Sequence, residues 1–170
     1  MGATRFTQLV GYFRQLAEKH VAIQHTATKK HFYRFELDEV LSGLKNINYP
    51  ALILEAYSIG YSDNKSDNVM KHRNGSFILL GHVADKGDYA AIHELWDELE
   101  TIGDDILAKI RADKRDITVK VVKDFNVENV EVGIVANMVG NDYGLRYSFT
   151  LTSPAPIDVD ETRWLSTSGS

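Results

Sequence analysis

Apolar residues recur every three or four positions in two parts of the chain, and this spacing gives a helix one buried face. Residues 5–21 have this spacing and predict an N-terminal helix. Residues 89–110 have it over a longer stretch, directly after Asp88, which is a good helix N-cap. The pattern therefore predicts two amphipathic helices, the second much longer than the first.

Short runs of β-forming residues between turn-forming residues predict the strands. Residues 51–61 follow Pro50 directly, and residues 77–83 follow the polar segment 62–76. We expect these two strands to form a hairpin whose extended tip is 62–76. After the long helix we expect three antiparallel strands, at residues 117–124, 130–139 and 145–152.

Two weaker patterns lie between the first helix and the first strand. Residues 24–34 have no sustained period and predict a connector, although 31–35 are compatible with a short strand. A helical turn is expected through Leu37, Val40, Leu41 and Leu44. The sequence Tyr49-Pro50 then prevents the helix from continuing.

The last predicted strand alternates in polarity. Leu145, Tyr147, Phe149 and Leu151 alternate with Arg146, Ser148, Thr150 and Thr152, so one face is expected to be buried and the other wet. Glycine at both ends of residues 140–144 predicts a hairpin before this strand.

These elements predict an α+β fold with an antiparallel or mixed β-sheet, on which the long amphipathic helix and the N-terminal helix pack. Residues 1–153 are expected to form a single domain. Residues 154–170 are acidic and rich in Ser and Thr, so we expect a flexible tail, in which Trp164 and Leu165 are available for docking.

Composition indicates a soluble globular protein. Of the 170 residues, 44% are hydrophobic and 25% are charged, and the longest apolar run is far below the roughly 18 residues that span a membrane. The N-terminus lacks the pattern of a secretory signal, so we expect a cytoplasmic location. With no cysteine, the chain has no disulfide, thiolate metal site or cysteine nucleophile.

Charge is distributed unevenly. The net charge of −5 argues against general nucleic-acid binding, which depends on clustered Lys and Arg. Residues 1–50 nevertheless have an excess of basic side chains, whereas residues 85–116 have an excess of acidic ones. This polarity suits electrostatic matching between subunits as well as it suits solubility.

No motif for catalysis, a cofactor or a metal is present. His93 and Asp97 have helical i,i+4 spacing, but two ligands do not make a site, and we expect both on the helix surface. Residues 63–68 resemble a calcium loop only in composition, so a turn is expected there. Phosphate-binding glycine patterns and a serine-hydrolase motif are absent. An enzyme without a recognisable motif would have to use His72, His82 and His93 with nearby carboxylates.

Two basic clusters are candidates for binding. Residues 29–34 and 71–73 place basic side chains beside aromatic or turn residues, which would also suit single-stranded nucleic acid. On the hairpin tip, Lys65, Lys71, His72 and Arg73 are candidates for contact with a partner protein, and the alternative is an ordinary polar loop.

The order of elements resembles that of tail-terminator (tail-completion, head–tail joining) proteins of tailed phages. The resemblance is carried by Asn48-Tyr49-Pro50 leading into the strand to Glu55, by residues 76–83, by residues 88–111 and by residues 130–152. It covers roughly residues 5–153. The connector and short helix at 22–48 are longer than in the family, and the tail after Ser153 has no obvious counterpart. These departures leave a related contractile injection particle, a head–tail joining protein or another family with the same fold as alternatives.

The resemblance implies a structural virion protein without catalytic residues. Such a protein forms a hexameric ring that caps the tail tube, halts its polymerisation and joins it to the head connector. Its partners would be further copies of itself, the tail-tube protein and the connector protein, with DNA only passing through the ring. It would be assembled in the host cytoplasm and reside in the tail or neck of the virion. The alternatives are a nucleic-acid-binding or regulatory interaction module and a metal-dependent enzyme.

Overall fold

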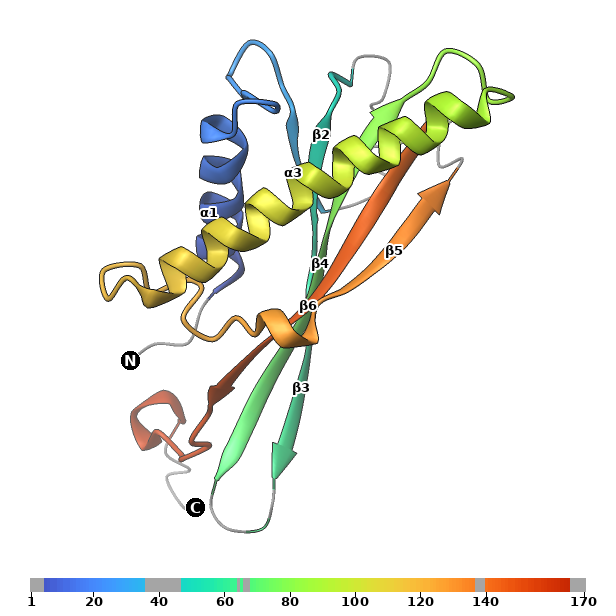
Figure 1. Ribbon diagram of the computed structural model, residues 1–170. Helices are drawn as coiled ribbons and strands as arrows, with labels where there is room; N and C mark the ends of the chain where they lie inside the picture. Colours follow the sequence, from blue (N-terminus) through green and yellow to red (C-terminus); the bar gives the residue numbers. More distant parts are fainter. Residues whose placement is uncertain (1–4, 36–46, 64, 66–67, 137–139, 166–170) are drawn as a thin grey trace.

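The computed structural model describes residues 5–35, 47–63, 65, 68–136 and 140–165. Two helices pack on one face of a six-stranded mixed sheet, which is the α+β fold expected from the sequence (Figure 1). The helices are α1 (Phe6–Lys19) and α3 (Tyr89–Arg115). The strands are β1 (Phe32–Phe35), β2 (Ala51–Glu55), β3 (Ser58–Asp63), β4 (Val69–His82), β5 (Glu131–Ala136) and β6 (Asp142–Pro154). Short 3-10 turns are η2 (Val127–Asn129) and η3 (Glu161–Arg163).

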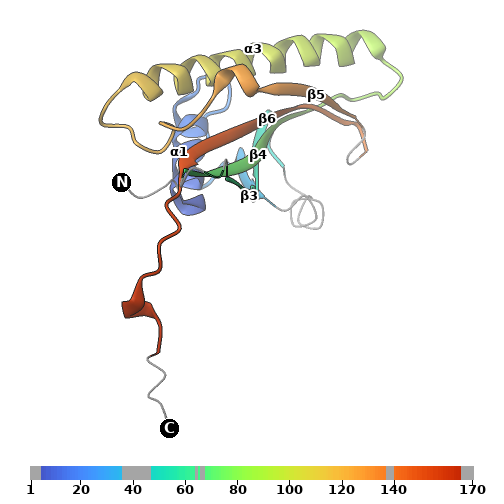
Figure 2. The ribbon, with the colours of Figure 1, turned by 90° about the horizontal axis from the view of Figure 1, so that it is seen from below.

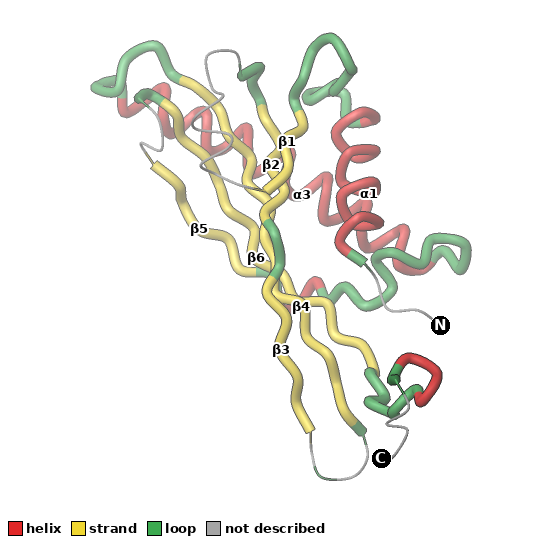
Figure 3. Tube along the Cα trace, turned by 180° about the vertical axis from the view of Figure 1, so that it is seen from behind, coloured by secondary structure: helices red, strands yellow, loops and turns green. Residues whose placement is uncertain are grey.

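The sheet is built around the long antiparallel pair of β4 and β6, which are in register from Met70↔Pro154 to His82↔Asp142. The strand order is β1-β2-β4-β6-β5, with β1 and β2 parallel and the other pairs antiparallel. Strand β3 pairs with the first half of β4, on the edge that β2 occupies farther along. Strand β3 and the paired ends of β4 and β6 therefore extend beyond the helices as a three-stranded ribbon, residues 58–63, 69–75 and 149–154 (Figures 1 and 3).

The main core lies between the helices and the sheet. The apolar positions of β6 alternate as expected, and Tyr147 stacks on Phe77 of β4 with ring centroids 4.7 Å apart. Helix α3 approaches this pair closely, because Gly103 lies where any Cβ would overlap the Tyr147 ring. The buried residues that the helices contribute are Leu9, Val10, Tyr12, Phe13, Leu16, Ala17, Leu99, Ile102, Ile106 and Ile110.

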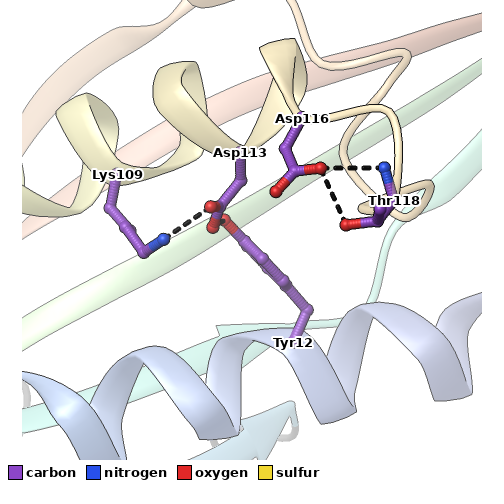
Figure 4. A network of polar contacts seen from close by, with 5 residues as sticks. All are labelled: Tyr12, Lys109, Asp113, Asp116 and Thr118. Atoms are coloured by element: carbon purple, nitrogen blue, oxygen red, sulfur yellow. Dashed lines mark hydrogen bonds and ion pairs between the residues drawn. The ribbon is translucent and has the colours of Figure 1, made fainter.

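The C-terminal end of α3 is fastened to α1 by a small polar network (Figure 4). The Tyr12 hydroxyl of α1 donates to Asp113 Oδ2 of α3 at 2.8 Å, and Lys109 Nζ donates to Asp113 Oδ1 at 2.5 Å. Burial, followed by the Asp113 carboxylate, raises the pKa of Tyr12. The helix ends at Asp116, whose carboxylate accepts hydrogen bonds from the Thr118 amide and hydroxyl, and these bonds lower the pKa of Asp116.

Three sequence predictions need correction. The expected strand 51–61 is divided into β2 and β3 at Ala56 and Tyr57. The expected polar tip 62–76 is too long, since β4 begins at Val69 and runs between β3 and β6. Residues 69–74 pair with β3 and residues 70–76 pair with β6, and this pairing overrides their weak β-propensity.

The third correction concerns residues 117–124, which form turns and not a strand. They place Val122, fully buried, over the core, and the segment then makes a single bridge between Phe125 and Leu151. Val122 is thus explained by burial in the core and not by sheet pairing, with Val119 and Val121 packed beside it, whereas Ile117 is exposed. In the hairpin at 140–144, Gly140 has a positive φ of 66°, whereas Asp142, Tyr143 and Gly144 already belong to β6. The helical turn expected through Leu37 and Leu44 lies outside the described residues.

Candidate functional site

The ribbon contains the four residues that the sequence indicated for partner contact, but their side chains differ in how exposed they are. Lys65 lies at the tip, is exposed and has a positive φ of 64°. Its amide donates to Asp63 Oδ1 at 2.8 Å, so the Asp63 side chain closes a tight turn at Lys65. Lys71 belongs to β4, and its ammonium lies 5.3 Å from the centre of the Tyr61 ring. These two cations remain available at the end of the ribbon.

His72 and Arg73 are held within the ribbon. His72 joins all three strands, because its Nε2 lies 2.7 Å from Ser62 Oγ of β3 and its Nδ1 lies 3.1 Å from Thr152 Oγ1 of β6. Arg73 is only 3% exposed. Its guanidinium packs over the Tyr57 ring and donates from Nη1 to Ser153 Oγ at 3.3 Å. The hypothesis that Arg73 lies on an exposed loop is therefore wrong, since the side chain is covered where the ribbon leaves the core.

The sheet face opposite the helices, which Figure 3 views from behind, changes from apolar to polar side chains along its length. At one end Ala51, Ile53, Ile78 and Leu80 are buried beneath Tyr33, Ile47 and Tyr49. Next along the sheet, Arg146 Nη2 donates to Glu55 Oε1 at 2.9 Å, and the Ser76 hydroxyl donates to the other carboxylate oxygen. An open depression of about 880 Å³ surrounds this pair and is lined largely by polar side chains. The sheet pattern did not reveal it, because the residues come from five separate segments.

A second polar cluster joins Tyr49, His82 and Asp142. The Asp142 carboxylate is 3% exposed, accepts from the Tyr49 hydroxyl at 2.9 Å and lies 2.7 Å from His82 Nδ1. Burial, followed by the hydrogen bond to Asp142, raises the pKa of Tyr49. The His82 ring stacks on the Tyr49 ring with centroids 5.5 Å apart. The cluster fastens the residues before β2 to the start of β6, and the sequence analysis missed it because its members are far apart in the chain.

The histidines proposed for an enzyme are not brought together. His72 lies in the ribbon, His82 at the end of β4, and His93 on the exposed face of α3 beside Trp96. Within the residues that the structure describes, no three His, Asp or Glu side chains are grouped to hold a metal ion. His93 and Asp97 are both exposed on α3, as expected.

The two end strands of the sheet differ in chemistry. Strand β5 pairs only with β6 among the described strands, and Val132 and Ile134 on it are 51% and 63% exposed. Acidic residues lie near this end, namely Glu128, Glu131 and the carboxylates on the first half of α3. At the other end, a groove of about 620 Å³ runs between α1 and β1 and is lined by Arg14, Glu18, His25, Ala27, Lys30, Phe32, Tyr33 and Arg34.

No protein-family model and no curated protein matches this sequence. The helices in the described ranges are all too short or too polar to cross a membrane.

Proposed function

We propose that this chain is a structural subunit that assembles with copies of itself into a ring, and that the ring works in the tail or neck of a phage-like particle as tail-terminator proteins do. The order of helices and strands, which resembles that of tail-terminator proteins, supports the assignment to a phage-like particle. The outer edge of β5, which pairs with no other described strand, supports the self-assembly, and this edge is the observation that carries the proposal.

Strand β5 has the properties of an edge that another chain covers. An exposed edge strand offers free N–H and C=O groups to any extended partner, and monomeric proteins usually protect it with lysine, proline or a bulge. The sequence of β5, Glu-Val-Gly-Ile-Val-Ala, contains no lysine and no proline, and its only charged residue is the first, Glu131. Val132 and Ile134 lie on the helix side of the sheet, but α3 leaves both exposed. A neighbouring copy would remove this apolar surface from water.

The ends of the sheet also differ in charge, which favours head-to-tail contacts between copies. The β1 end carries Arg14, Lys30 and Arg34, and the β5 end carries Glu128 and Glu131. Unlike surfaces that meet in this way produce a ring when the rotation between copies closes. A two-fold dimer would instead place like charges opposite each other.

The ribbon is the surface we assign to the tail tube or the head connector. It extends beyond the helices (Figure 1) and ends in Lys65. Ile59 and Tyr61 on β3 are 49% and 56% exposed, and Lys71 lies beside Tyr61. Exposed aromatic and aliphatic side chains beside cations are the composition of a protein contact.

The test is the solution mass of the purified chain by light scattering, followed by negative-stain imaging with and without tail-tube protein. We expect ring-shaped particles, and we expect the Val132→Lys/Ile134→Lys variant to raise the dissociation constant of self-association by roughly 10-fold to 100-fold. Ile117→Lys is the matched control, because Ile117 is 91% exposed in the turns after α3, away from β5. A chain that stays monomeric at all concentrations, with the tube protein present, would contradict the proposal.

A further inference from the structure

The chain continues past the last strand as an exposed arm, residues 155–165, whose direction differs from that of the sheet. Its first amide, that of Ala155, still donates to Val69 O at 2.8 Å. Beyond that point the arm leaves the sheet and projects away from both helices (Figure 2). It begins at the free end of the ribbon, so its side chains do not contribute to the core of their own chain.

The arm combines exposed apolar side chains with acidic ones. Ile157 and Val159 are 68% and 69% exposed, and Trp164 and Leu165 are 69% and 98% exposed. Asp158 and Asp160 alternate with the aliphatic residues, which is the pattern of a strand with one apolar face. A large exposed Trp-Leu pair is unusual on a surface that stays in water and is common at protein contacts.

A turn holds the end of the arm in a defined shape. The Asp160 carboxylate accepts from the Thr162 amide at 3.2 Å and from its hydroxyl at 2.6 Å. Arg163 Nε lies 2.9 Å from Asp160 Oδ2. This capped turn presents Trp164 and Leu165 together. Local order of this kind reduces the entropy lost on binding.

The groove between α1 and β1 has the complementary chemistry. Arg14, Lys30 and Arg34 outnumber the single carboxylate of Glu18, so the groove is positive. The arm has Asp158, Asp160 and Glu161 against Arg163 and is negative by the same margin. Phe32 and Tyr33 line the groove from the two faces of β1, and Arg14 lies 5.9 Å from the centre of the Phe32 ring. Among the described strands, β1 pairs only with β2, so its outer edge lines the groove.

We propose that the arm of one copy docks in the α1–β1 groove of a second copy. The aliphatic residues of the arm lie along β1, the Trp-Leu end packs beside the aromatic residues that line the groove, and the acidic residues face Lys30, Arg34 and Arg14. This inference rests on the self-assembly proposed above and adds which segment links neighbouring copies. An arm that is shared between copies joins them even before a ring has closed.

Charge reversal with rescue tests the contact directly. The arm variant is Asp158→Lys/Glu161→Lys, and the groove variant is Lys30→Glu/Arg34→Glu; all four side chains are exposed. Each variant alone should raise the dissociation constant of self-association by roughly 10-fold, and reversing the arm in the groove variant should lower the dissociation constant again, because arm and groove are then oppositely charged once more. Misfolding cannot produce such recovery. A chain truncated after Pro156 that assembles as well as the full chain would overturn the inference, as would two reversals that do not compensate each other.

Disulfide trapping identifies the two surfaces, since the chain has no cysteine of its own. Copies with Ala27→Cys in the groove are mixed with copies with Leu165→Cys on the arm, and the control replaces the groove cysteine by Ala108→Cys on the exposed side of α3. We expect the mixed disulfide to form several-fold faster with the groove than with α3. An equal rate would overturn the inference, as would closure within a monomer when one chain carries both Ala27→Cys and Leu165→Cys.

The two proposals fail in different ways. If the truncated chain still forms rings, the proposed arm contact is contradicted and the proposed ring is not. If arm-to-groove disulfides form but no rings are seen on the tail tube, the proposed ring is contradicted and the proposed contact between copies is not.

Discussion

Gly103 sets the distance between α3 and the sheet. A Cβ at this position would overlap the ring of Tyr147, which is fixed by its stack on Phe77. We expect Gly103→Ala to move the helix outward and to lower the free energy of unfolding by about 1–3 kcal/mol. Gly11→Ala is the matched control, because that site on α1 is exposed and has no atom near the new Cβ. It should raise the free energy of unfolding by about 0.5–1 kcal/mol. Urea titration compares the two variants, and equal effects would contradict the close approach.

The hydroxyl of Tyr147 is predicted to lower the stability of the fold. It is buried and has no hydrogen-bond partner within the described part of the chain. Burial, followed by the charges of Asp104 and Glu100, raises the pKa of Tyr147 to about 12. Removing an unpaired buried hydroxyl should stabilise the fold, so we expect Tyr147→Phe to add about 1 kcal/mol at pH 8. In contrast, Tyr12→Phe removes a hydroxyl that donates to Asp113 and should cost about 1 kcal/mol.

Tyr147→Phe should also change how the free energy of unfolding depends on pH at alkaline pH. An unfolded tyrosine ionises near pH 10, whereas Tyr147 in the folded chain keeps its proton until about pH 12. Above pH 10 the unfolded state therefore holds fewer protons, and the free energy of unfolding falls as the pH rises towards 12. Tyr147→Phe should lessen this fall. Urea titrations at pH 8, 10 and 11 measure it, and parallel curves for the two chains would show that Tyr147 does not contribute.

At the scale of elements, β1 is tied to the connector before it by His25. The neutral Nδ1 of His25 accepts the amides of His31 at 3.0 Å and Phe32 at 3.2 Å. Burial lowers the pKa of His25, Glu18 opposes this shift, and nearby cations add to it. The unfolded histidine takes up its proton near pH 6.5, before the folded one does, so stability falls as the pH drops below 6.5.

His25→Asn tests this attachment, because the amide oxygen can accept at the same place and never takes a proton. We expect the variant to lose the decrease in unfolding free energy between pH 7.5 and 5 that the natural chain has. His25→Ala should cost about 1 kcal/mol at pH 7.5, since the amides of His31 and Phe32 lose their acceptor. A natural chain whose stability does not change over this pH range would contradict the role of His25.

The elements that the sequence predicted best are those whose signal is local. The spacing of Leu9, Phe13 and Leu16 is enough for α1, and the alternation of Tyr147 and Phe149 is enough for one face of β6. Residues 69–76 have no such local pattern, because β3 and β6 on either side make them a strand. The burial of Arg73 and the Tyr49–Asp142 hydrogen bond likewise depend on pairings between distant segments. Of the four residues proposed for partner contact, Lys65 is exposed at the tip of the ribbon and Lys71 is half-buried beside it, and their contact with a partner stays a prediction.

At the scale of the whole molecule, the sheet is open and its two ends carry opposite charge. The β1 end is basic through Arg14, Lys30 and Arg34, and the β5 end is acidic through Glu128 and Glu131. In the contact that we propose, the arm adds further carboxylates to this charge pattern. The apolar surface of Val132 and Ile134 adds a contact that does not depend on charge. Self-association should therefore have an electrostatic part and an apolar part that respond differently to salt.

Salt separates these two parts. Raising the ionic strength from about 0.05 M to 0.5 M shortens the Debye length to a few ångströms, so exposed opposite charges attract less. We expect the dissociation constant of self-association to rise by roughly 10-fold and then to level off, because the apolar contact of β5 persists. Sedimentation equilibrium measures it, and urea titration in the same buffers confirms that the fold is unchanged. Association that strengthens steadily with salt would mean that β5 alone joins the copies and that the charge polarity of the molecule serves only its solubility.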